Sequence, residues 1–311
     1  MIVFGVAVTD MGTYDCCALP GIRRAAEPDS EVLAHQSVGS LFRNYNLLLD
    51  LARTYDDLEA LVLVHQDAEI VDTDFCDKVR KALESPDVAV VGCAGAVGVQ
   101  NIAWWEGAVT WASFTHRYQE FGGGEFRSMS WNPDRMPSIA GTGEVDSIDG
   151  FVMVLSPWAV RELRFDESLG NLHGYDFDFC AQARAAGKKV VTFDVRAVHH
   201  HSLELISDSD TWIEAYIRLA EKWDGRLPNA GRRGSDWRSR ALRAEAEAAA
   251  AKGKAVSEHL KFQAMELQQE RLLNSKSWRL TAPLRLPRNL MQRLRRRRDH
   301  VRQPDDRAHS A

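Results

Sequence analysis

The sequence of 311 residues predicts an α/β protein with a Rossmann-like sheet and flanking helices. Short apolar runs without polar alternation recur along the chain, and such runs are typical of strands covered on both faces. Amphipathic segments with helix-capping residues separate the runs, so that strand and helix alternate. Polar residues follow the strands directly, where open α/β sheets bind their ligands. Together these observations predict a parallel sheet with right-handed crossovers and a site at its carboxyl edge.

Four strands are predicted in the first third of the chain. They are expected at residues 2–8, 31–36, 60–67 and 88–93. A polar connection with glycine and proline is expected between the first strand and Asp29. Short polar side chains mark the starts of the intervening helices, because their oxygens can accept a hydrogen bond from the first free N–H groups. These candidate caps are Ser37 or Ser40 before a helix that ends near residue 53, and Asp72 or Thr73 before a helix at 74–83.

An aromatic insertion interrupts this rhythm at residues 95–143. It holds eight aromatic residues, Trp105 among them, and three consecutive glycines. Flat aromatic faces suit a sugar ring or a base, so the segment is a candidate binding wall. A small apolar cluster beneath a long loop explains the same pattern equally well.

Regular elements resume after the insertion. A strand is expected at residues 145–155, and Ser156-Pro157 has the residues typical of a helix start. A further helix is expected at 176–186 with Gly187 as its end, followed by a last strand at 190–198. That strand brings His199, His200 and His201 to its carboxyl end.

The C-terminal third differs in composition. A helix is predicted at residues 212–222, a glycine-containing linker at 231–234 and a long helix at 239–273. We divide the chain into a catalytic-type domain, a helical closing segment with linker, a long helix able to pair as a coiled coil, and a basic, partly disordered tail. Their predicted boundaries are 1–205, 206–235, 236–275 and 276–311.

Charge is distributed unevenly. The segment from Arg279 to Arg302 holds nine arginines and one acid, a local charge of +8, within a chain whose total is -5; the remainder therefore carries -13. An acidic body argues against nucleic acid as a partner. The basic segment, interleaved with leucines, suits an anionic membrane surface. A disordered solubilising tail is the alternative.

The cysteines and the apolar runs indicate the compartment. The five cysteines are odd in number and lack C-x-x-C spacing, so we expect reduced core residues. The run at residues 2–8 is too short for a signal peptide, and no run approaches the roughly 20 residues of a membrane span. We therefore expect a cytoplasmic protein, with peripheral association at the inner face of the plasma membrane if the tail binds there.

Three groups of acids or histidines lie on one side of the predicted sheet. Side chains alternate along a strand, so His65 and Asp67 share a face while Gln66 looks the other way. Asp176 and Asp178 are two residues apart on a helix and therefore face differently, one towards the site and the other capping the helix or facing solvent. We expect Asp67, Asp176 and one histidine of 199–201 to converge on a single cleft around a cation-bound diphosphate.

The order of these motifs resembles that of metal-dependent family-2-type glycosyltransferases of glycosyltransferase-A fold, in the bacterial branch with H-Q-D in place of D-x-D. The stretch Phe165-Asp-Glu, the run from Gly174 to Cys180 and the run from Gly187 to Val190 are similar to that family's "FDE", "ED-x-DL" and "R-x-x-G" motifs. Two positions depart from the pattern. His65 replaces the first carboxylate, and Tyr175 replaces the glutamate before the catalytic aspartate.

The resemblance implies a glycosyltransferase-A, Rossmann-like mixed sheet and inverting transfer of a sugar from a nucleotide-diphosphate donor to an acceptor hydroxyl. It implies Mn²⁺ or Mg²⁺ as cofactor, a carbohydrate or lipid-linked acceptor, and a role in cell-surface polysaccharide or glycolipid assembly. Asp176 would be the catalytic base, rigid and ionised at a helix start. The other expected site residues are Asp67, His199 and His65 for the metal, with His200 as an alternative to His199; Thr9, Gln66 and Asp67 for the nucleotide sugar; and Asp149, Gly150, Trp105 and Tyr175 for the acceptor.

Two other functions compete with this interpretation. A sugar nucleotidyltransferase would use a similar sheet but needs a dense, basic glycine-rich loop after the first strand, and residues 11–24 hold only two glycines and two arginines. A non-catalytic nucleotide-sugar-binding or scaffold protein would use the long helix and the basic tail instead. It predicts that alanine at Asp67 and Asp176 leaves the cellular function intact.

Overall fold

The computed structural model describes residues 1–37, 39–99, 101–104, 109–112, 114–117, 125–127, 143–200, 206, 208–224, 226–227 and 237–280. Trp105, His201 and the tail beyond residue 280 lie outside these ranges. The chain divides into two compact units, Met1–Glu258 and His259–Ala311, which are described separately. The division falls inside the long C-terminal helix, and the four domain boundaries expected from the sequence stay predictions.

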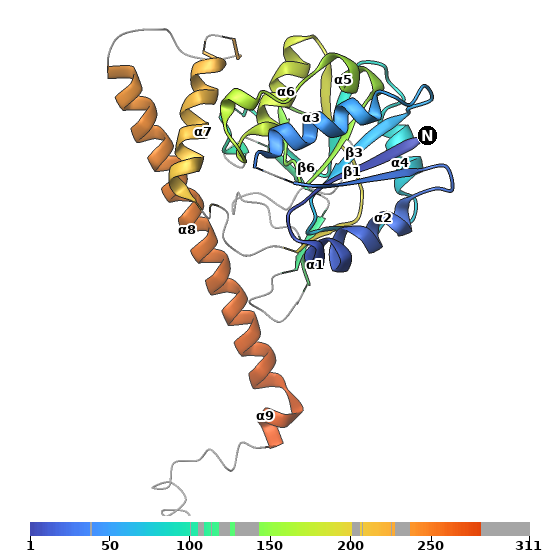
Figure 1. Ribbon diagram of the computed structural model, residues 1–311. Helices are drawn as coiled ribbons and strands as arrows, with labels where there is room; N and C mark the ends of the chain where they lie inside the picture. The colour runs from blue at the N-terminus through green and yellow to red at the C-terminus, as the bar shows by residue number, and fades with distance from the viewer. Residues whose placement is uncertain are drawn as a thin grey trace, which may run out of the picture. The chain divides into compact units, whose positions relative to one another are not determined.

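A mixed seven-stranded sheet forms the centre of the first unit (Figure 1). Its order is β10-β13-β5-β12-β3-β1-β2. The strands are β1 (Ile2–Val8), β2 (Glu31–Gln36), β3 (Ala60–Val64), β5 (Val88–Gly92), β10 (Gly143–Val145), β12 (Val152–Leu155) and β13 (Lys189–Thr192). Strands β1, β3, β5 and β12 are almost wholly buried, as their unbroken apolar runs predict. The α/β class with a mixed sheet, flanking helices and a C-terminal helix is confirmed.

Strands β12 and β10 make the sheet mixed, because β10 at the edge also pairs antiparallel, with β13. The parallel pairs β1–β2 and β1–β3 agree with the alternation of strand and helix. Between β3 and β5, however, β12 inserts and pairs antiparallel with both. A strand buried on both faces has the same apolar pattern in either direction, so the pattern alone predicted a parallel sheet. The insertion brings the start of β12 next to the end of β3.

Helices cover both faces of the sheet. A side chain at Gly5 of β1 would meet Leu48 of α3 (Leu41–Ala52), whereas the neighbouring Phe4 packs against Phe75 of α4 (Phe75–Ala82), with ring centroids 5.9 Å apart. Adjacent residues of a strand face opposite ways, so α3 and α4 lie on opposite faces. Helices α5 (Pro157–Glu162) and α6 (Tyr175–Ala185) lie near α3 in Figure 1. Ser40 and Ser156 cap α3 and α5 as expected.

Two predicted strands are shorter pieces that belong to different sheets. The stretch 145–155 contains the end of β10, then β11 (Ser147–Ile148) and β12. The stretch 190–198 is β13 followed by β14 (Ala197–His199), because the chain turns where the backbone N–H of Arg196 donates to Asp72. β14 joins a small sheet of order β4-β14-β8-β9, and β11 joins β6 (Ala94–Val97) and β7 (Val109–Ala112). The partners of β14 are β4 (Ala68–Ile70), β8 (Phe114–Arg117) and β9 (Glu125–Arg127).

The expected connection after the first strand is helical instead. Asp10 caps α1 (Met11–Thr13), which continues through a π-helical turn, η1 (Tyr14–Ala18), into α2 (Leu19–Ala25). Pro20 lies in the first turn of α2, where an N–H is not needed. Gly21 lies against the backbone of Ile70, where a Cβ atom would overlap. Proline and glycine here serve a helix start and close packing, not a loop.

The cap predicted for α4 is wrong. Helix α4 begins at Phe75 with Asp74 as its N-cap residue, not Asp72 or Thr73. Asp72 is buried, accepts a hydrogen bond from the N–H of Asp74 and forms an ion pair with Lys78 at 2.6 Å. Its carboxylate joins α4 to the turn before β14.

The C-terminal helices agree closely with the sequence. They are α7 (Ser209–Lys222), α8 (Trp237–Asn274) and α9 (Lys276–Leu280). A short helix, η4 (Glu167–Leu169), precedes α6. Across the part of the chain that the structure describes, no helix combines the length and apolar character required to span a membrane.

Candidate functional site

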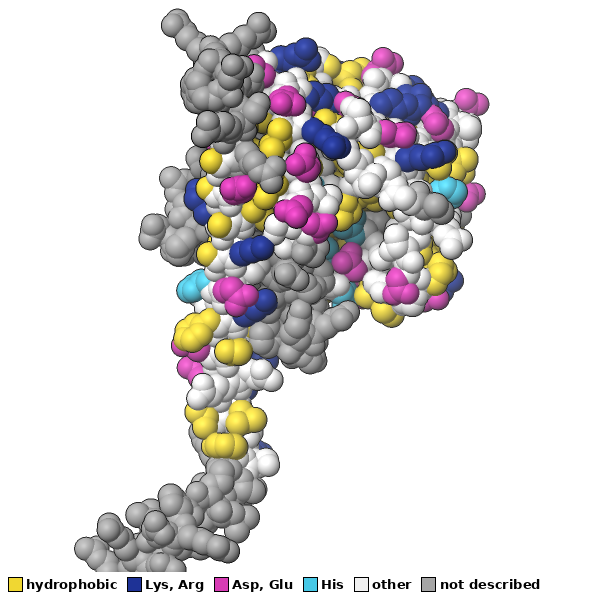
Figure 2. Space-filling model, turned by 60° about the vertical axis from the view of Figure 1, so that its left-hand side comes forward, with side chains coloured by type: hydrophobic (Ala, Val, Ile, Leu, Met, Phe, Trp, Pro, Cys, Tyr) yellow, Lys and Arg dark blue, Asp and Glu magenta, His cyan; other side chains and the backbone are white. Residues whose placement is uncertain are grey.

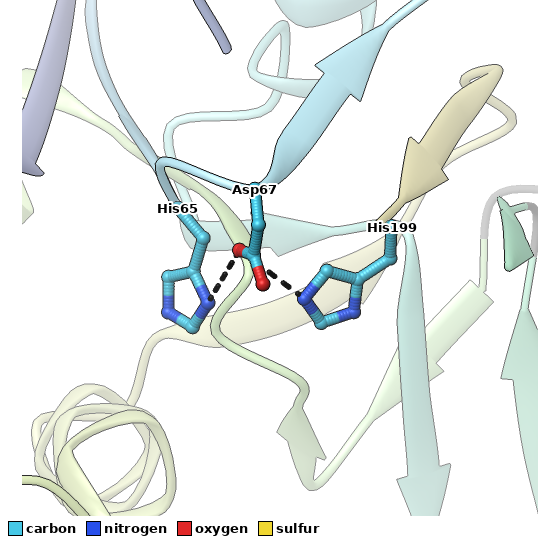
Figure 3. Close-up of side chains that lie close together, drawn as sticks. All are labelled: His65, Asp67 and His199. Carbon is cyan, nitrogen blue, oxygen red and sulfur yellow. Dashed lines mark ion pairs between the residues drawn. The ribbon is translucent and has the colours of Figure 1, made fainter. Parts of the chain in front are cut away.

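His65, Asp67 and His199 form a compact group at the carboxyl end of β3. Nδ1 of His65 lies 3.9 Å from Oδ1 of Asp67, and Nε2 of His199 lies 3.6 Å from the same oxygen (Figure 3). The three ligand atoms all lie within 4.8 Å of one another. Each side chain is partly accessible. Asp67 and His199 therefore lie together as expected, joined by His65, whereas Asp176, which was expected to meet them in one cleft, is not part of this group.

Strand pairing brings these residues together. The backbone N–H of His65 donates to the carbonyl of Phe151 at the start of β12, at 2.9 Å. In the small sheet, His199 of β14 is the register partner of Ala68, the residue after Asp67. The ring of Phe151 stacks on that of His199 with centroids 4.5 Å apart. Two different sheets therefore fix the group.

His200 faces away from this group. Its backbone N–H donates to the carbonyl of Asp67, and its Nε2 lies 3.0 Å from Oε2 of Glu69. The side chains of adjacent strand residues alternate, so His199 points towards Asp67 while His200 points towards Glu69. The structure favours His199 over His200 as the metal ligand.

The donor set fits a divalent cation. Two ligand atoms about 2.1 Å from one ion lie roughly 3–4 Å apart, and the distances from Oδ1 of Asp67 to the two histidine nitrogens, 3.9 and 3.6 Å, agree with this. Burial lowers the pKa of His65, opposed by the charge of Asp67, so the imidazole is neutral near pH 7 and has a lone pair to donate. One carboxylate oxygen and two imidazole nitrogens suit Mn²⁺ better than Mg²⁺ because nitrogen is the softer ligand.

A cavity of about 510 Å³ opens at this group. The walls come from the ends of β1 and β2, the start of α3, the loop before α6 and the start of α7. Figure 2 shows a hollow in which histidine and acidic side chains are visible. The described residues that line the cavity are Ala7, Thr9, Ser37, Gly39, Leu41, Tyr45, His65, Gln66, Asp67, Asn171, Leu172, His173, Asp208 and Thr211. None of them is lysine or arginine, so an anionic ligand needs a cation there.

Gln66 connects the ends of β1 and β3. Its side-chain oxygen accepts from the backbone N–H groups of Thr9 at 2.8 Å and Asp10 at 2.9 Å. Its amide nitrogen donates to the hydroxyl of Thr9 at 2.8 Å. Thr9 and Gln66 both line the cavity, but much of their hydrogen-bonding capacity is used between them. Asp10 is occupied as the cap of α1.

Asp176 lies behind the metal group. Its carboxylate accepts from the backbone N–H groups of Gly150 at 3.0 Å and Phe177 at 2.9 Å. Burial, and secondarily the charge of Asp149, raises its pKa to about 7. The expectation that Asp176 is simply ionised is therefore corrected, because burial disfavours the charge. It is absent from the described lining of the cavity, and Tyr175, the residue before it, contacts His65 of the metal group at 2.7 Å.

The residues expected to bind the acceptor surround this carboxylate. Asp149 is half-buried, and its Oδ1 accepts from the N–H of Phe151. Gly150 lies so close to Tyr175 that a Cβ atom would overlap the phenol hydroxyl. Tyr175 is only 6% exposed, and its hydroxyl lies 2.7 Å from Nε2 of His65. Trp105 lies outside the described residues.

Asp178 has a structural position that the sequence did not reveal. It is fully buried and neither caps the helix nor faces solvent. Its carboxylate forms an ion pair with Lys222 at 2.8 Å and accepts from Nε1 of Trp223 at 2.8 Å and from Gln182 at 2.7 Å. Asp166, from the Phe165-Asp-Glu motif, pairs with the same lysine at 2.7 Å. These acids anchor the end of α7.

The loop before α6 and the start of α7 contribute cavity residues that sequence analysis missed. His173 lines the cavity, and its Nε2 is buried without a hydrogen-bond partner. Asp208 and Thr211 also line it, although Asp208 is the N-cap residue of α7 and accepts from the N–H of Thr211. The sequence offered one signal, an aspartate just before a helical stripe, which suggests a cap and nothing more.

A family of known sequences matches this chain. The family described as "Glycosyltransferase like family" matches residues 3–216, from β1 into α7. The match contains the metal group, Asp176 and every described residue that lines the cavity.

Two curated relatives share part of the chain. "Streptomycin biosynthesis protein StrF" of Streptomyces griseus is 27% identical over 205 residues, which are 65% of this chain and 67% of that protein. "O-antigen biosynthesis protein RfbC" of Myxococcus xanthus is 25% identical over 181 residues, which are 55% of this chain but only 13% of that protein.

Two solved structures are similar to this chain at lower sequence identity than the curated relatives. A crystal structure of GalNAc-T7 with UDP, GalNAc and Mn²⁺ aligns with a TM-score of 0.48 and 9% identity, covering 79% of this chain and 54% of that one. The mannosyltransferase PcManGT from Pyrobaculum calidifontis, in complex with GDP-Man and Mn²⁺, aligns with a TM-score of 0.44 and 15% identity, covering 90% and 81%.

Proposed function

Because the chain belongs to the glycosyltransferase-like family, we propose that it is a metal-dependent, inverting glycosyltransferase that moves a sugar from a nucleotide-diphosphate donor to an acceptor hydroxyl. One observation carries the proposal: a carboxylate and two imidazoles meet at a cavity whose described lining contains neither lysine nor arginine. The donor's diphosphate is anionic, and it enters such a cavity only with a cation.

The metal site consists of Asp67, His199 and His65 in this proposal. When bound by these residues, Mn²⁺ or Mg²⁺ would neutralise the charge that develops on the leaving diphosphate. The protein holds the ligands in place beforehand, through the pairing of His199 with Ala68 and the hydrogen bond from His65 to Phe151. Such preorganisation lowers the barrier because the site does not rearrange as charge develops.

The nucleotide sugar occupies the cavity in this proposal. A volume of about 510 Å³ is within the usual range of small-molecule sites. Thr9 and Gln66 form the wall beside the metal group, where Asp67 would hold the cation that neutralises the diphosphate. The hydrogen bonds between Gln66 and the Thr9-Asp10 backbone keep this wall rigid.

Asp176 is our candidate for the general base that deprotonates the acceptor hydroxyl. A pKa of about 7 is well matched to this task near neutral pH, because about half of the carboxyl groups are then deprotonated and the carboxylate is still basic enough to take a proton. Asp149, Gly150 and Trp105 are the proposed acceptor wall. Tyr175, which was also expected beside the acceptor, instead contacts His65, with its hydroxyl 2.7 Å from Nε2.

The acceptor is proposed to be a carbohydrate or lipid-linked molecule of cell-surface polysaccharide or glycolipid assembly. The likeness to a relative named for O-antigen biosynthesis supports this class. The basic segment Arg279–Arg302 would hold the protein at the cytoplasmic face of an anionic membrane, where a lipid-linked acceptor resides.

A screen of nucleotide sugars tests the function. The purified full-length chain is incubated with uridine, thymidine and guanosine diphosphate sugars and Mn²⁺, and free nucleotide diphosphate is measured. We expect release from one donor class, abolished by EDTA and by Asp67→Asn but kept by the control Asp77→Asn, whose side chain is exposed on α4. The anomeric configuration of the product, read by NMR, tests inversion.

Other outcomes identify the competing functions. Release of pyrophosphate from a nucleoside triphosphate and a sugar phosphate would mark a nucleotidyltransferase. Binding of nucleotide sugar with no turnover for any donor and acceptor pair would favour a binding protein. Either result overturns the transferase proposal.

A further inference from the structure

A stripe of apolar side chains lies exposed on the C-terminal half of α8. It consists of Phe262, Met265, Leu272 and Leu273, each between 44% and 56% exposed. Figure 2 shows hydrophobic side chains on the lower part of this helix. With 3.6 residues per turn, these four positions fall on one side of the helix. Large apolar side chains that gather on one exposed face mark a surface that another molecule covers.

The other side of the helix is already buried. Leu260 and Ala264 lie opposite the stripe and are 6% and 5% exposed. Leu267 is also directed away from the stripe, although its side chain is accessible to solvent. The stripe is therefore a second apolar face, separate from the buried one.

The stripe has the spacing of a two-stranded coiled coil. Phe262 and Met265 occupy the a and d positions of one heptad, and Gln269 and Leu272 occupy those of the next. Leu273 flanks this seam at an e position. One polar residue such as Gln269 at an a position is compatible with a seam, because it fixes the register and the number of strands at a cost in stability. The same stripe on a second copy of the chain is thus a complementary surface.

The charges beside the stripe favour parallel helices. Lys261 occupies a g position, and Glu266 occupies the e position five residues later. In a parallel coiled coil, a g residue of one helix meets the following e residue of the other. Lys261 of each copy then faces Glu266 of the other copy, with opposite charge. An antiparallel pair centred on the stripe would place Lys261 opposite Asn274 instead.

An anionic membrane is a less suitable partner for this stripe. Glu258 and Glu266 border it, and both carboxylates would face the negative surface. Helices that lie on such membranes carry lysine and arginine beside their apolar face. The dense positive charge of this chain begins only at Arg279, beyond the stripe.

We propose that this stripe binds a second copy of the chain, with the two α8 helices parallel and in register over residues 261–273. Helix α8 is already formed over 38 residues, so association does not include the unfavourable nucleation of a helix. Two heptads bury a small area, and the dimer is therefore reversible. Both basic segments leave the same end of the paired helices, so they can engage one anionic surface together.

Sedimentation velocity of the full-length chain over a range of concentrations tests the dimer. A salt concentration of about 0.15 M limits repulsion between the two basic segments. We expect a monomer–dimer equilibrium. Leu272→Glu places a carboxylate in the seam and is expected to weaken dimerisation by about 100-fold or more. Leu267→Glu, the matched control on the other side of the helix, is expected to leave dimerisation unchanged. A chain that stays monomeric, or equal effects of both variants, overturns the proposal.

Charge reversal tests the parallel register. Lys261→Glu and Glu266→Lys each replace attraction by repulsion, and each is expected to weaken self-association by about fivefold. A mixture of the two variants restores opposite charges at both contacts, so mixed dimers are expected to form in preference to either homodimer. Energy transfer between differently labelled variants measures this preference. Random mixing overturns the parallel register.

Vesicle binding identifies the competing occupant. If the chain is monomeric and Leu272→Glu abolishes its co-sedimentation with phosphatidylglycerol vesicles, the stripe belongs to the membrane and the proposal is overturned. These measurements need no sugar donor. A failure of the transferase proposal therefore leaves the dimer proposal standing, and the reverse also holds.

Discussion

Asp176 shows how one side chain is tuned by its surroundings. Burial acts first and the charge of Asp149 second, and both raise its pKa, whereas the N–H groups of Phe177 and Gly150 lower it. A base acts only when deprotonated, so turnover is expected to increase with pH and to reach half its maximum near pH 7. The pH dependence of kcat measures this midpoint.

Asp149→Asn tests the cause of the shift. It removes the neighbouring negative charge, so the pKa of Asp176 falls and the rising limb of the kcat profile moves to lower pH. A limb that moves to higher pH, or stays in place, contradicts the assignment of Asp176 as the titrating base. Asp176→Asn is expected to remove the limb together with most of the activity.

Adjacent histidines provide a matched test of the metal group. His199→Gln removes a nitrogen 3.6 Å from Asp67, whereas His200→Gln removes one that pairs with Glu69. We expect the first variant to weaken Mn²⁺ binding by about 10–100-fold and the second by about threefold or less. Titration calorimetry with Mn²⁺ alone measures both. A larger loss in His200→Gln would reverse the assignment.

Some site residues could be predicted from the sequence and others could not. His65 and Asp67 directly follow an apolar strand, and this position, together with the other acids and histidines expected on the same side of the sheet, indicated their importance. The choice between His199 and His200 depended on the register of β14 with β4, which pairs residues more than 100 positions apart. Tyr175 was assigned to the acceptor because nothing in the sequence indicates that its hydroxyl meets an imidazole from another strand.

At the level of elements, caps and apolar stripes were predicted well, whereas glycine and proline were misleading. The bounds of α6 and α8, the end of α3 and the start of α5 depend on local signals, and the structure agrees within about two residues. Residues 11–25 were predicted as a loop because Gly12, Pro20 and Gly21 are typical turn residues. Only the tertiary contact of Gly21 with β4 explains its presence within a helix.

Helix α7 is attached to the sheet domain through Lys222. Its ammonium pairs with Asp178, which is fully buried, and with Asp166. Lys222→Met leaves the charge of Asp178 buried with only its bonds to Trp223 and Gln182. We expect a loss of about 2 kcal/mol in the free energy of unfolding, below the full cost of a broken buried pair because the lysine side chain is 23% exposed.

Urea unfolding of Lys222→Met measures this loss. Lys189→Met is the matched control, since that lysine is half exposed and lies 3.8 Å from an exposed Glu144. Surface pairs of this kind contribute about 0–1 kcal/mol. Equal changes in the two variants would show that the Asp178 pair does not anchor α7.

At the level of the whole molecule, the direction of the strands could not be predicted from the apolar pattern of the sequence. The buried runs of β3, β5 and β12 look alike, so the pattern did not distinguish an inserted antiparallel strand from another parallel one. The resemblance to a known family supplied the mixed sheet. The insertion has a functional result, because the start of β12 holds Phe151 against both candidate metal-binding histidines.

The basic C-terminal segment is expected to bind anionic membranes. Truncation from Ser275 onward removes the +8 segment and leaves the sheet domain intact. Each arginine near an anionic surface contributes about 1 kcal/mol, so we expect loss of co-sedimentation with phosphatidylglycerol vesicles and strong salt sensitivity in the full chain. Neutral phosphatidylcholine vesicles serve as the control. Truncated protein that sediments as before would refute membrane binding by this segment.

The small sheet that carries His199 has a consequence for biogenesis. Asp67 leaves the ribosome early, but its partner strand β14 is translated more than 100 residues later, as the 131-position separation of Glu69 and His200 illustrates. Closing so long a segment is slow, and contacts of this kind form late. If the proposed metal site is correct, nascent chains are therefore expected to bind the cation only near the end of domain synthesis. Detachment of β14 from β4 would release the ion while the seven-stranded sheet stays folded.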